Sequence, residues 1–256
     1  MILAFVMAPP SDAKPSRCLA IAENNPGITY VSLRQAALAE DEVKLTFVGH
    51  STYLIETPQG VTIATDYAGY AGPGVVPKVV TMNHAHETHY TDFPDSRIEH
   101  VLRGWDPKGG AANHDVEVDD VHIRNVPTDI RTWAGTPEVF GNSIFIFEVA
   151  GLCIGHLGHL HHIPTPQHYG IIGILDVVMV PVDGTFTLKH DSMAEVLKTL
   201  RARLILPMHF FGTGTLASFL DALGGVFEIK THDGPTITIS DKTLPKKPTV
   251  MVLPGF

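Results

Sequence analysis

The sequence has few of the features that define several common protein classes. It contains two cysteines among 256 residues, which excludes a disulfide framework and a cysteine-only zinc site. No apolar run reaches the roughly 18 residues that a membrane span requires, so we expect a soluble protein without membrane insertion. Lysine and arginine total 18 against 27 acidic residues, for a net charge of -9. Because phosphate backbones are bound by clustered basic side chains, this balance argues against nucleic acid as a partner.

The two cysteines and the N-terminal segment leave the cellular location open. Cys18 and Cys153 could form one disulfide bond in an oxidising compartment, but one buried and one flexible thiol is the simpler expectation. Residues 2–8 are apolar and precede two prolines, as in a shortened signal peptide, although a basic region in front of them is missing. An ordinary terminal extension explains this segment equally well. The chain could therefore be exported to a periplasm or remain cytoplasmic.

The bulk composition and the hydrophobic pattern predict one globular α/β domain. Hydrophobic residues make up 44% of the chain, and no repeat or long linker divides it, so we expect an N-terminal extension at 1–42 and a single domain at 43–256. Helical spacing predicts helices at about 191–200 and 215–223. Alternating or continuous apolar runs predict strands at 43–48, 53–56, 61–64, 78–82, 98–102, 114–118, 121–126, 142–149, 152–155, 174–182, 203–207, near 227, and at 236–239 and 250–253.

Histidine is the unusual feature of the composition, because the chain contains 15 of them. The segment His84–His89 places three, His84, His86 and His89, directly after the strand expected at 78–82. In a tight loop this spacing can point two or three ring nitrogens at one ion, and neutral imidazole suits zinc, iron, nickel and manganese. The segment therefore predicts metal ligands, whereas a lone histidine is more often structural.

Two further histidine positions also follow expected strands. In the segment 156–162, His156 and His159 lie nearest to the strand end, while its other histidines are expected to face solvent or to support the ligands. His209 comes directly after the strand at 203–207. Strand ends are where α/β proteins usually place chemistry, so we expect these side chains to join the first group. A histidine-rich surface loop is the alternative for the segment 156–162.

Several short motifs, taken in their order along the chain, resemble those of the metallo-β-lactamase superfamily. The resemblance covers about residues 43–223 and is narrower to the branch of the ascorbate-6-phosphate lactonases and related metal-dependent hydrolases. It implies a four-layered αββα sandwich with a metal centre at one edge, and hydrolysis by a metal-bound hydroxide. The motifs lie at 49–56, 64–66, 84–89, 156–158, 180–187 and 207–210.

The resemblance also implies roles for individual residues. His84 and His86 match ligands of a first metal, His89 and His209 match ligands of a second metal, and Asp66 matches the acidic residue that borders the site. An aspartate at this position can orient a ligand histidine through the second ring nitrogen of that histidine.

Three departures from the family pattern change what is expected of the metal. Thr88 and His159 stand where the family has carboxylate ligands, and Thr128 stands where it has a further histidine. A carboxylate can bridge two cations and offset their charge, whereas a neutral imidazole does neither. We therefore expect one divalent transition metal rather than two, with zinc as the first choice and iron, manganese or nickel as alternatives. His159, which reaches further than aspartate, is expected to take the vacated ligand position.

Proton transfer and substrate contacts are less constrained by the sequence. Asp66 and Asp183 are the candidate catalytic carboxylates, although Asp183 precedes a glycine and a role in a turn fits it equally well. Three residues on loops near the expected edge are candidates for substrate contact: Tyr67, Arg131 and Trp133.

Three functions are compatible with these features. The first is a metal-dependent hydrolase that acts on a small ester, lactone or phosphoester. The second is a metal-binding protein without turnover, which the replaced carboxylates at positions 88 and 159 favour. The third is redox chemistry at iron or manganese, because an all-histidine site also suits those ions. The sequence assigns neither the substrate nor the oligomeric state.

Overall fold

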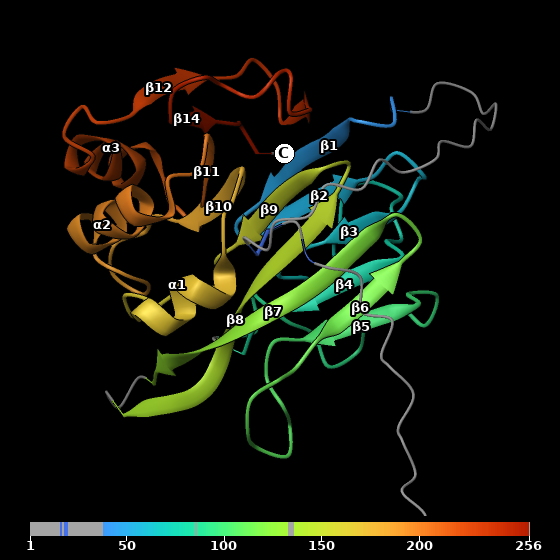
Figure 1. Ribbon diagram of the computed structural model, residues 1–256. Coiled ribbons are helices and arrows are strands. Elements are labelled where there is room, and N and C mark those ends of the chain that lie inside the picture. The colour runs from blue at the N-terminus through green and yellow to red at the C-terminus, as the bar shows by residue number, and fades with distance from the viewer. Residues whose placement is uncertain (1–15, 17, 20–37, 85, 133–135, 256) are drawn as a thin grey trace, which may run out of the picture.

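The computed structural model describes residues 16, 18–19, 38–84, 86–132 and 136–255, and in them two β-sheets pack face to face with helices against one of them (Figure 1). The signal-peptide-like segment at 2–8 and Trp133 lie outside the described residues. The expected α/β sandwich is confirmed. None of the helices in the described ranges is long and apolar enough to cross a membrane.

The first sheet has six strands and carries the first histidine loop. The neighbours from β13 to β3 in this sheet pair antiparallel, whereas β3, β4 and β5 run parallel to one another. In spatial order it contains β13 (Thr236–Ile239), β1 (Val43–Gly49), β2 (Thr52–Glu56), β3 (Thr62–Ala64), β4 (Val79–Met82) and β5 (His100–Arg103).

The second sheet has eight strands and carries the other two histidine positions. Its strands β9, β10, β11, β14 and β12 are parallel, so their carboxyl ends meet at one edge of the sheet. In spatial order it contains β12 (Glu228–Thr231), β14 (Thr249–Val252), β11 (Leu204–Met208), β10 (Val177–Pro181), β9 (Leu152–His156), β8 (Pro137–Val149), β7 (Val121–Arg131) and β6 (Asp115–Val118).

The strands of the second sheet separate two hydrophobic cores. In β8, Phe145 and Phe147 face the first sheet, whereas Ile144 and Ile146 face the helices. Successive side chains of a strand point to opposite faces, so a strand between two cores must be apolar at every position. This explains the continuous apolar run that predicted β10, all of whose residues are buried.

Three helices cover the outer face of the eight-stranded sheet (Figure 1): α1 (Pro166–Ile172), α2 (His190–Leu200) and α3 (Thr213–Ala222). The helical spacing predicted α2 and α3, but α1 was not expected. Thr165 caps α1 by accepting a hydrogen bond from the backbone of His168, and Pro166 occupies its first turn. In the described ranges, loops rather than helices cover the outer face of the six-stranded sheet, around Tyr67 and Met82.

The cysteines correct one expectation. Cys18 and Cys153 are joined by a disulfide bond that spans 135 positions of the sequence, so the prediction of two separate thiols is wrong. The bond holds Cys18 against the second core, where its carbonyl accepts a hydrogen bond from the backbone of Ile174. Sequence spacing could not show this pairing, because only the fold brings β9 next to a residue near the N-terminus.

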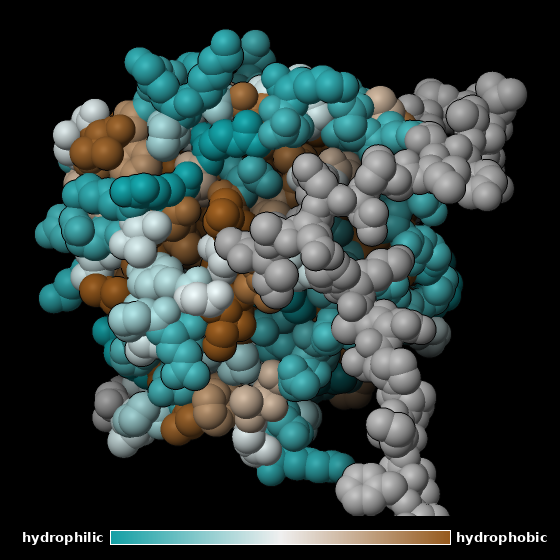
Figure 2. All heavy atoms as spheres, in the orientation of Figure 1, coloured by the Kyte–Doolittle hydropathy of each residue, from teal (hydrophilic) through white to brown (hydrophobic). Residues whose placement is uncertain are grey.

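The surface agrees with the acidic, globular composition. Figure 2 shows that the face seen in Figure 1 is largely hydrophilic, with apolar side chains gathered in a few smaller areas. The site lies at the edge of the sandwich where β4, β9 and β11 end in histidine-bearing loops.

Candidate metal centre

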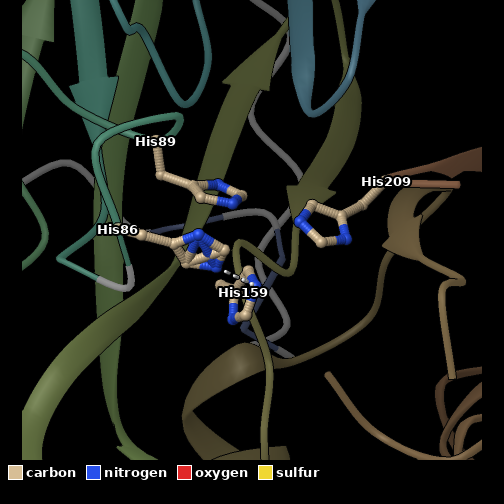
Figure 3. A group of neighbouring side chains, drawn as sticks. All are labelled: His86, His89, His159 and His209. Atoms are coloured by element: carbon tan, nitrogen blue, oxygen red, sulfur yellow. Dashed lines mark hydrogen bonds between the residues drawn. The ribbon is translucent and has the colours of Figure 1, made fainter. Parts of the chain in front are cut away.

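Four histidines from three loops converge at the edge of the sandwich (Figure 3). His86 and His89 follow β4, His159 follows β9 and His209 follows β11. One ring nitrogen of each lies within 4.8 Å of the corresponding nitrogen of every other. His86 is partly exposed, while the other three are buried. We call these four residues the imidazole cluster.

A buried carboxylate fixes the orientation of His89. The Nδ1–H of His89 donates to Asp66 Oδ2 at 2.8 Å, and both side chains are fully buried. Asn83 Nδ2 donates to the other carboxylate oxygen at 2.6 Å. Burial raises the pKa of Asp66, but attraction to His156 and the hydrogen bonds from His89 and Asn83 outweigh it and lower that pKa overall. His89 therefore presents a bare Nε2, and this buried atom has no hydrogen-bond partner among the described residues.

A second carboxylate fixes His209 in the same way. The Nδ1–H of His209 donates to Asp183 Oδ1 at 3.0 Å, again between fully buried side chains. Asp183 Oδ2 also accepts the backbone N–H groups of Thr185, Phe186 and Thr187. Burial raises the pKa of Asp183, but the hydrogen bonds from His209 and Thr187 outweigh it and keep the carboxylate ionised. The buried Nε2 of His209 has no partner in the described ranges either.

His159 is held by a chain of hydrogen bonds rather than by a carboxylate. The backbone N–H of Arg131 donates to His161 Nδ1 at 3.0 Å, so His161 donates from Nε2 to His159 Nδ1 at 2.5 Å. His159 Nε2 then faces His86 Nε2 at 3.0 Å, the contact dashed in Figure 3. Burial lowers the pKa of His86 and His159, which keeps both rings neutral. Metal binding through His159 Nε2 would require the ring proton on Nδ1, so the hydrogen bond between His159 and His161 would then run in the opposite direction.

The cluster fits a divalent transition metal. Two of its nitrogens are buried and unpartnered, a state that costs about 1–3 kcal/mol per polar group unless a ligand satisfies it. Four neutral imidazoles suit zinc, iron or nickel better than magnesium or calcium, which prefer oxygen. No carboxylate belongs to the cluster in the part of the chain that the structure describes. The donor set thus suits one ion better than a closely spaced pair.

Two of the six histidines predicted as ligands lie outside the cluster. The Nδ1 of His84 pairs with Glu138 Oε1 at 2.5 Å, and its ring stacks on Trp105 at 4.9 Å between centroids. His156 is fully buried, and its two ring nitrogens are used by the carbonyl of Ser51 at 2.9 Å and the backbone N–H of Gly158 at 3.1 Å. In the structure these two side chains therefore lie outside the cluster and contact Glu138, Ser51 and Gly158.

Of the three positions that depart from the family pattern, Thr88 and Thr128 lie outside the cluster, whereas His159 belongs to it. Thr88 is exposed and its hydroxyl pairs with His50 Nε2 at 3.1 Å. Thr128 is buried and its hydroxyl accepts a hydrogen bond from Asn142 Nδ2 at 2.8 Å. His159 takes the position of the missing carboxylate, because its ring belongs to the cluster.

Several supporting residues were not predicted. Asn83 and Asn142 hold the loops of the cluster by accepting the backbone N–H groups of Ser143 and His159. Their sequence surroundings contain no signal, because an asparagine that follows a strand is common in any loop. Of the candidates for substrate contact, Arg131 does line the site, but Tyr67 packs into the apolar cluster under the first sheet.

A pocket of about 500 Å³ opens beside the cluster. His86 and His159 line this pocket on the side of the cluster. The volume of the pocket lies within the range of small-molecule sites. Its remaining walls come from β7, β8 and the loops after β4, β9 and β10 and include Tyr90, Arg131 and Phe186.

Comparisons with known proteins agree with this architecture. Residues 44–209 match the model of a family described as beta-lactamase superfamily domain. The chain is 24% identical over 192 residues to a UPF0173 metal-dependent hydrolase of Pelotomaculum thermopropionicum, covering 66% of this chain and 84% of that protein. It is 25% identical over 194 residues to a UPF0173 metal-dependent hydrolase of Pyrococcus abyssi, with the same two coverages.

Solved structures show the same fold. A metallo-β-lactamase superfamily protein of Thermotoga maritima superposes with a TM-score of 0.61 at 29% identity, covering 82% of this chain and 98% of that one. The metallo hydrolase Igni18 of Ignicoccus hospitalis superposes with a TM-score of 0.59 at 19% identity, covering 78% and 99%.

Proposed function

The chain belongs to the beta-lactamase superfamily, as its motifs predicted, and we propose that it is a hydrolase that holds one divalent metal ion in its imidazole cluster. The observation that carries this proposal is the pair of buried, unpartnered Nε2 atoms of His89 and His209. They face the same small volume as the nitrogens of His86 and His159. The narrower resemblance to ascorbate-6-phosphate lactonases stays a prediction.

The residues around the cluster divide into ligands and positioning groups. His86, His89, His159 and His209 are the proposed ligands, with zinc as the first choice of metal because tetrahedral nitrogen donors suit it. Asp66 and Asp183 are buried and fully engaged in hydrogen bonds, so we assign them to the orientation of His89 and His209. They are then positioning residues rather than proton carriers.

Hydrolysis at this site requires water and an open side of the ion. When bound, a divalent ion acts as a Lewis acid and lowers the pKa of a coordinated water toward neutrality. A catalytic site keeps one coordination position open, and here that position would face the pocket bordered by His86 and His159. A small ester, lactone or phosphoester fits the volume of this pocket.

One observation favours a second function, which is metal binding without turnover. Four protein ligands can close a tetrahedral site completely, as in structural zinc sites. The cluster contains four imidazoles, so a closed site is the competing arrangement. Turnover decides between the two, because a closed site binds metal but hydrolyses nothing.

Metal analysis of the purified protein tests the ligand set. We expect about one equivalent of a transition metal in the wild type and a large loss in His89→Ala and His209→Ala. His84→Ala is the matched control, because His84 belongs to the same loop but pairs with Glu138 outside the cluster, and it should retain the metal. Loss of metal in His84→Ala with retention in His209→Ala would overturn the proposed ligands. A screen of the metal-loaded protein on esters, lactones and phosphoesters then tests turnover.

A further inference from the structure

A fixed cation lies on the wall of the pocket beside the imidazole cluster. Arg131 Nε donates to His161 Nδ1 at 3.3 Å, and its Nη2 donates to the carbonyls of Thr187 at 3.0 Å and Phe186 at 3.4 Å. The residue is exposed and lines the pocket. These contacts hold the guanidinium plane by one edge and leave its other donors directed away from the three acceptors.

Arg131 forms no ion pair with a carboxylate in the described ranges. Arg97, Arg124 and Arg203 each form one, whereas Arg131 shares its lack of one with Arg103 and Arg201. Its three acceptors are two carbonyl oxygens and an imidazole. None of these three acceptors carries a formal negative charge, so the contacts of Arg131 in the described ranges do not offset its positive charge.

One carboxylate lines the pocket in the described residues, that of Glu138, and it pairs with His84 rather than with Arg131. A divalent ion held by the imidazole cluster would add two positive charges to that of Arg131, and together these outweigh the single carboxylate. Electrostatic complementarity then favours an anion in this pocket.

Part of the remaining wall is apolar. Tyr90, Ile130 and Phe186 line the pocket, and Tyr90 packs at 5.4 Å from the ring of Trp105. An apolar body in contact with these side chains would be removed from water, which adds affinity in proportion to the buried area. The pocket therefore combines one fixed cation with an apolar wall.

We propose that this pocket selects a small organic anion with an apolar body, and that Arg131 is the residue that binds its acidic group. The acidic group is a carboxylate or a phosphate, because both accept hydrogen bonds from a guanidinium fork. This proposal rests on the proposed function only where it calls the bound anion a substrate. Binding of the anion can be measured without turnover.

Calorimetric titration with small probes tests the proposal. The probes are benzoate and phenylphosphonate, with benzamide as the neutral counterpart, added to metal-free protein and to zinc-loaded protein. The variants are Arg131→Gln and Arg131→Lys, and Arg201→Gln is the control, because Arg201 is an exposed arginine outside the pocket. Thermal unfolding of each variant shows whether it is folded.

We expect the wild type to bind at least one of the two anions at least about tenfold more tightly than benzamide, because a charge-assisted hydrogen bond contributes at least that factor. Arg131→Gln should lose this preference in both metal states, Arg131→Lys should retain part of it, and Arg201→Gln should behave as the wild type. Tighter binding of benzoate than of phenylphosphonate, or the reverse, identifies the acidic group.

Two results would overturn the inference. One is equal binding of benzamide and both anions by the wild type. The other is an anion preference that survives in folded Arg131→Gln, which would leave Arg131 as a clamp between β7 and the loop after β10. The proposed function fails separately: an Arg131-dependent anion preference in a protein that holds no metal would retain this site and exclude the metal-dependent reaction.

Discussion

Replacement of Asp66 by asparagine should remove metal binding by changing which nitrogen of His89 carries the proton. The wild-type carboxylate accepts from both Asn83 Nδ2 and His89 Nδ1. The orientation of Asn83 is itself fixed, because its Oδ1 accepts the backbone N–H of Ser143 at 2.7 Å. In Asp66→Asn the new amide must turn its oxygen to Asn83 and its NH₂ group to His89. His89 Nδ1 then becomes an acceptor, and the proton moves to the Nε2 that should bind the metal.

The expected effect is a loss of metal affinity of about 10- to 100-fold, the usual result when the partner of a ligand histidine is removed. This corresponds to about 1.4–2.7 kcal/mol of binding free energy. Asp183→Asn should have the same effect. Three backbone N–H groups donate to Oδ2 of Asp183, so the oxygen of the new amide would take that position and its NH₂ group would face His209. Asp176→Asn is the control, since Asp176 pairs with Arg203 away from the cluster.

Competition for zinc against a chelator of known affinity measures the change, and ¹⁵N-resolved NMR of the histidine rings in metal-free protein reports the position of the proton. A folded Asp66→Asn protein with wild-type affinity and the proton still on Nδ1 would refute the reasoning. Thermal unfolding in the presence of chelator separates a loss of affinity from a loss of structure.

Three further predictions concern stability. Replacing Cys18 and Cys153 by serine should lower the free energy of unfolding by up to about 5 kcal/mol, the chain-entropy value for a loop of 135 residues; an unchanged melting temperature contradicts this. Because burial lowers the pKa of His159 from 6.5, the unfolded chain binds more protons, and metal-free protein should lose stability as the pH falls below about 6.5. A urea midpoint that is constant from pH 8 to 5 would argue against it. Gly158→Ala should cost about 1–3 kcal/mol, since its Cβ would lie 2.4–2.5 Å from two asparagine side chains at a φ of +60°, whereas Gly225→Ala has a similar φ and no atom within 4 Å. Similar melting temperatures for these two variants would contradict the steric argument.

The sequence was a good guide to the elements and to the edge that carries the site. Apolar periodicity depends on which face of a strand is buried, so it located strands such as β1 and β10 closely. The hydrophobic pattern did not predict the helix α1, because its seven residues bury a single side chain, Ile172, and therefore show no apolar periodicity. Its signals were local, namely the cap at Thr165 and the following proline.

The candidate site was predicted less completely. The sequence placed histidines at three strand ends, and four of the six predicted ligands do converge. It could not show that His84 and His156 lie outside the cluster, because only the fold places His84 beside Glu138 and brings both ring nitrogens of His156 into contact with the backbone. His89 and His209 stand out in the structure because each has a buried ring nitrogen without a hydrogen-bond partner in the described ranges. The amino-acid sequence alone does not show whether a nitrogen is buried or has a partner.

The sequence by itself therefore determined the sandwich, its family and the histidine-rich edge, since these depend on local hydrophobic pattern and on motif order. The tertiary structure decided which imidazoles face one another, which carboxylates set their tautomers, and that Cys18 bonds to Cys153. It also decided that the imidazole cluster lies beside Arg131, which forms no ion pair with a carboxylate in the described ranges. Each of these depends on distances between residues far apart in the chain, which are fixed only when the two sheets pack.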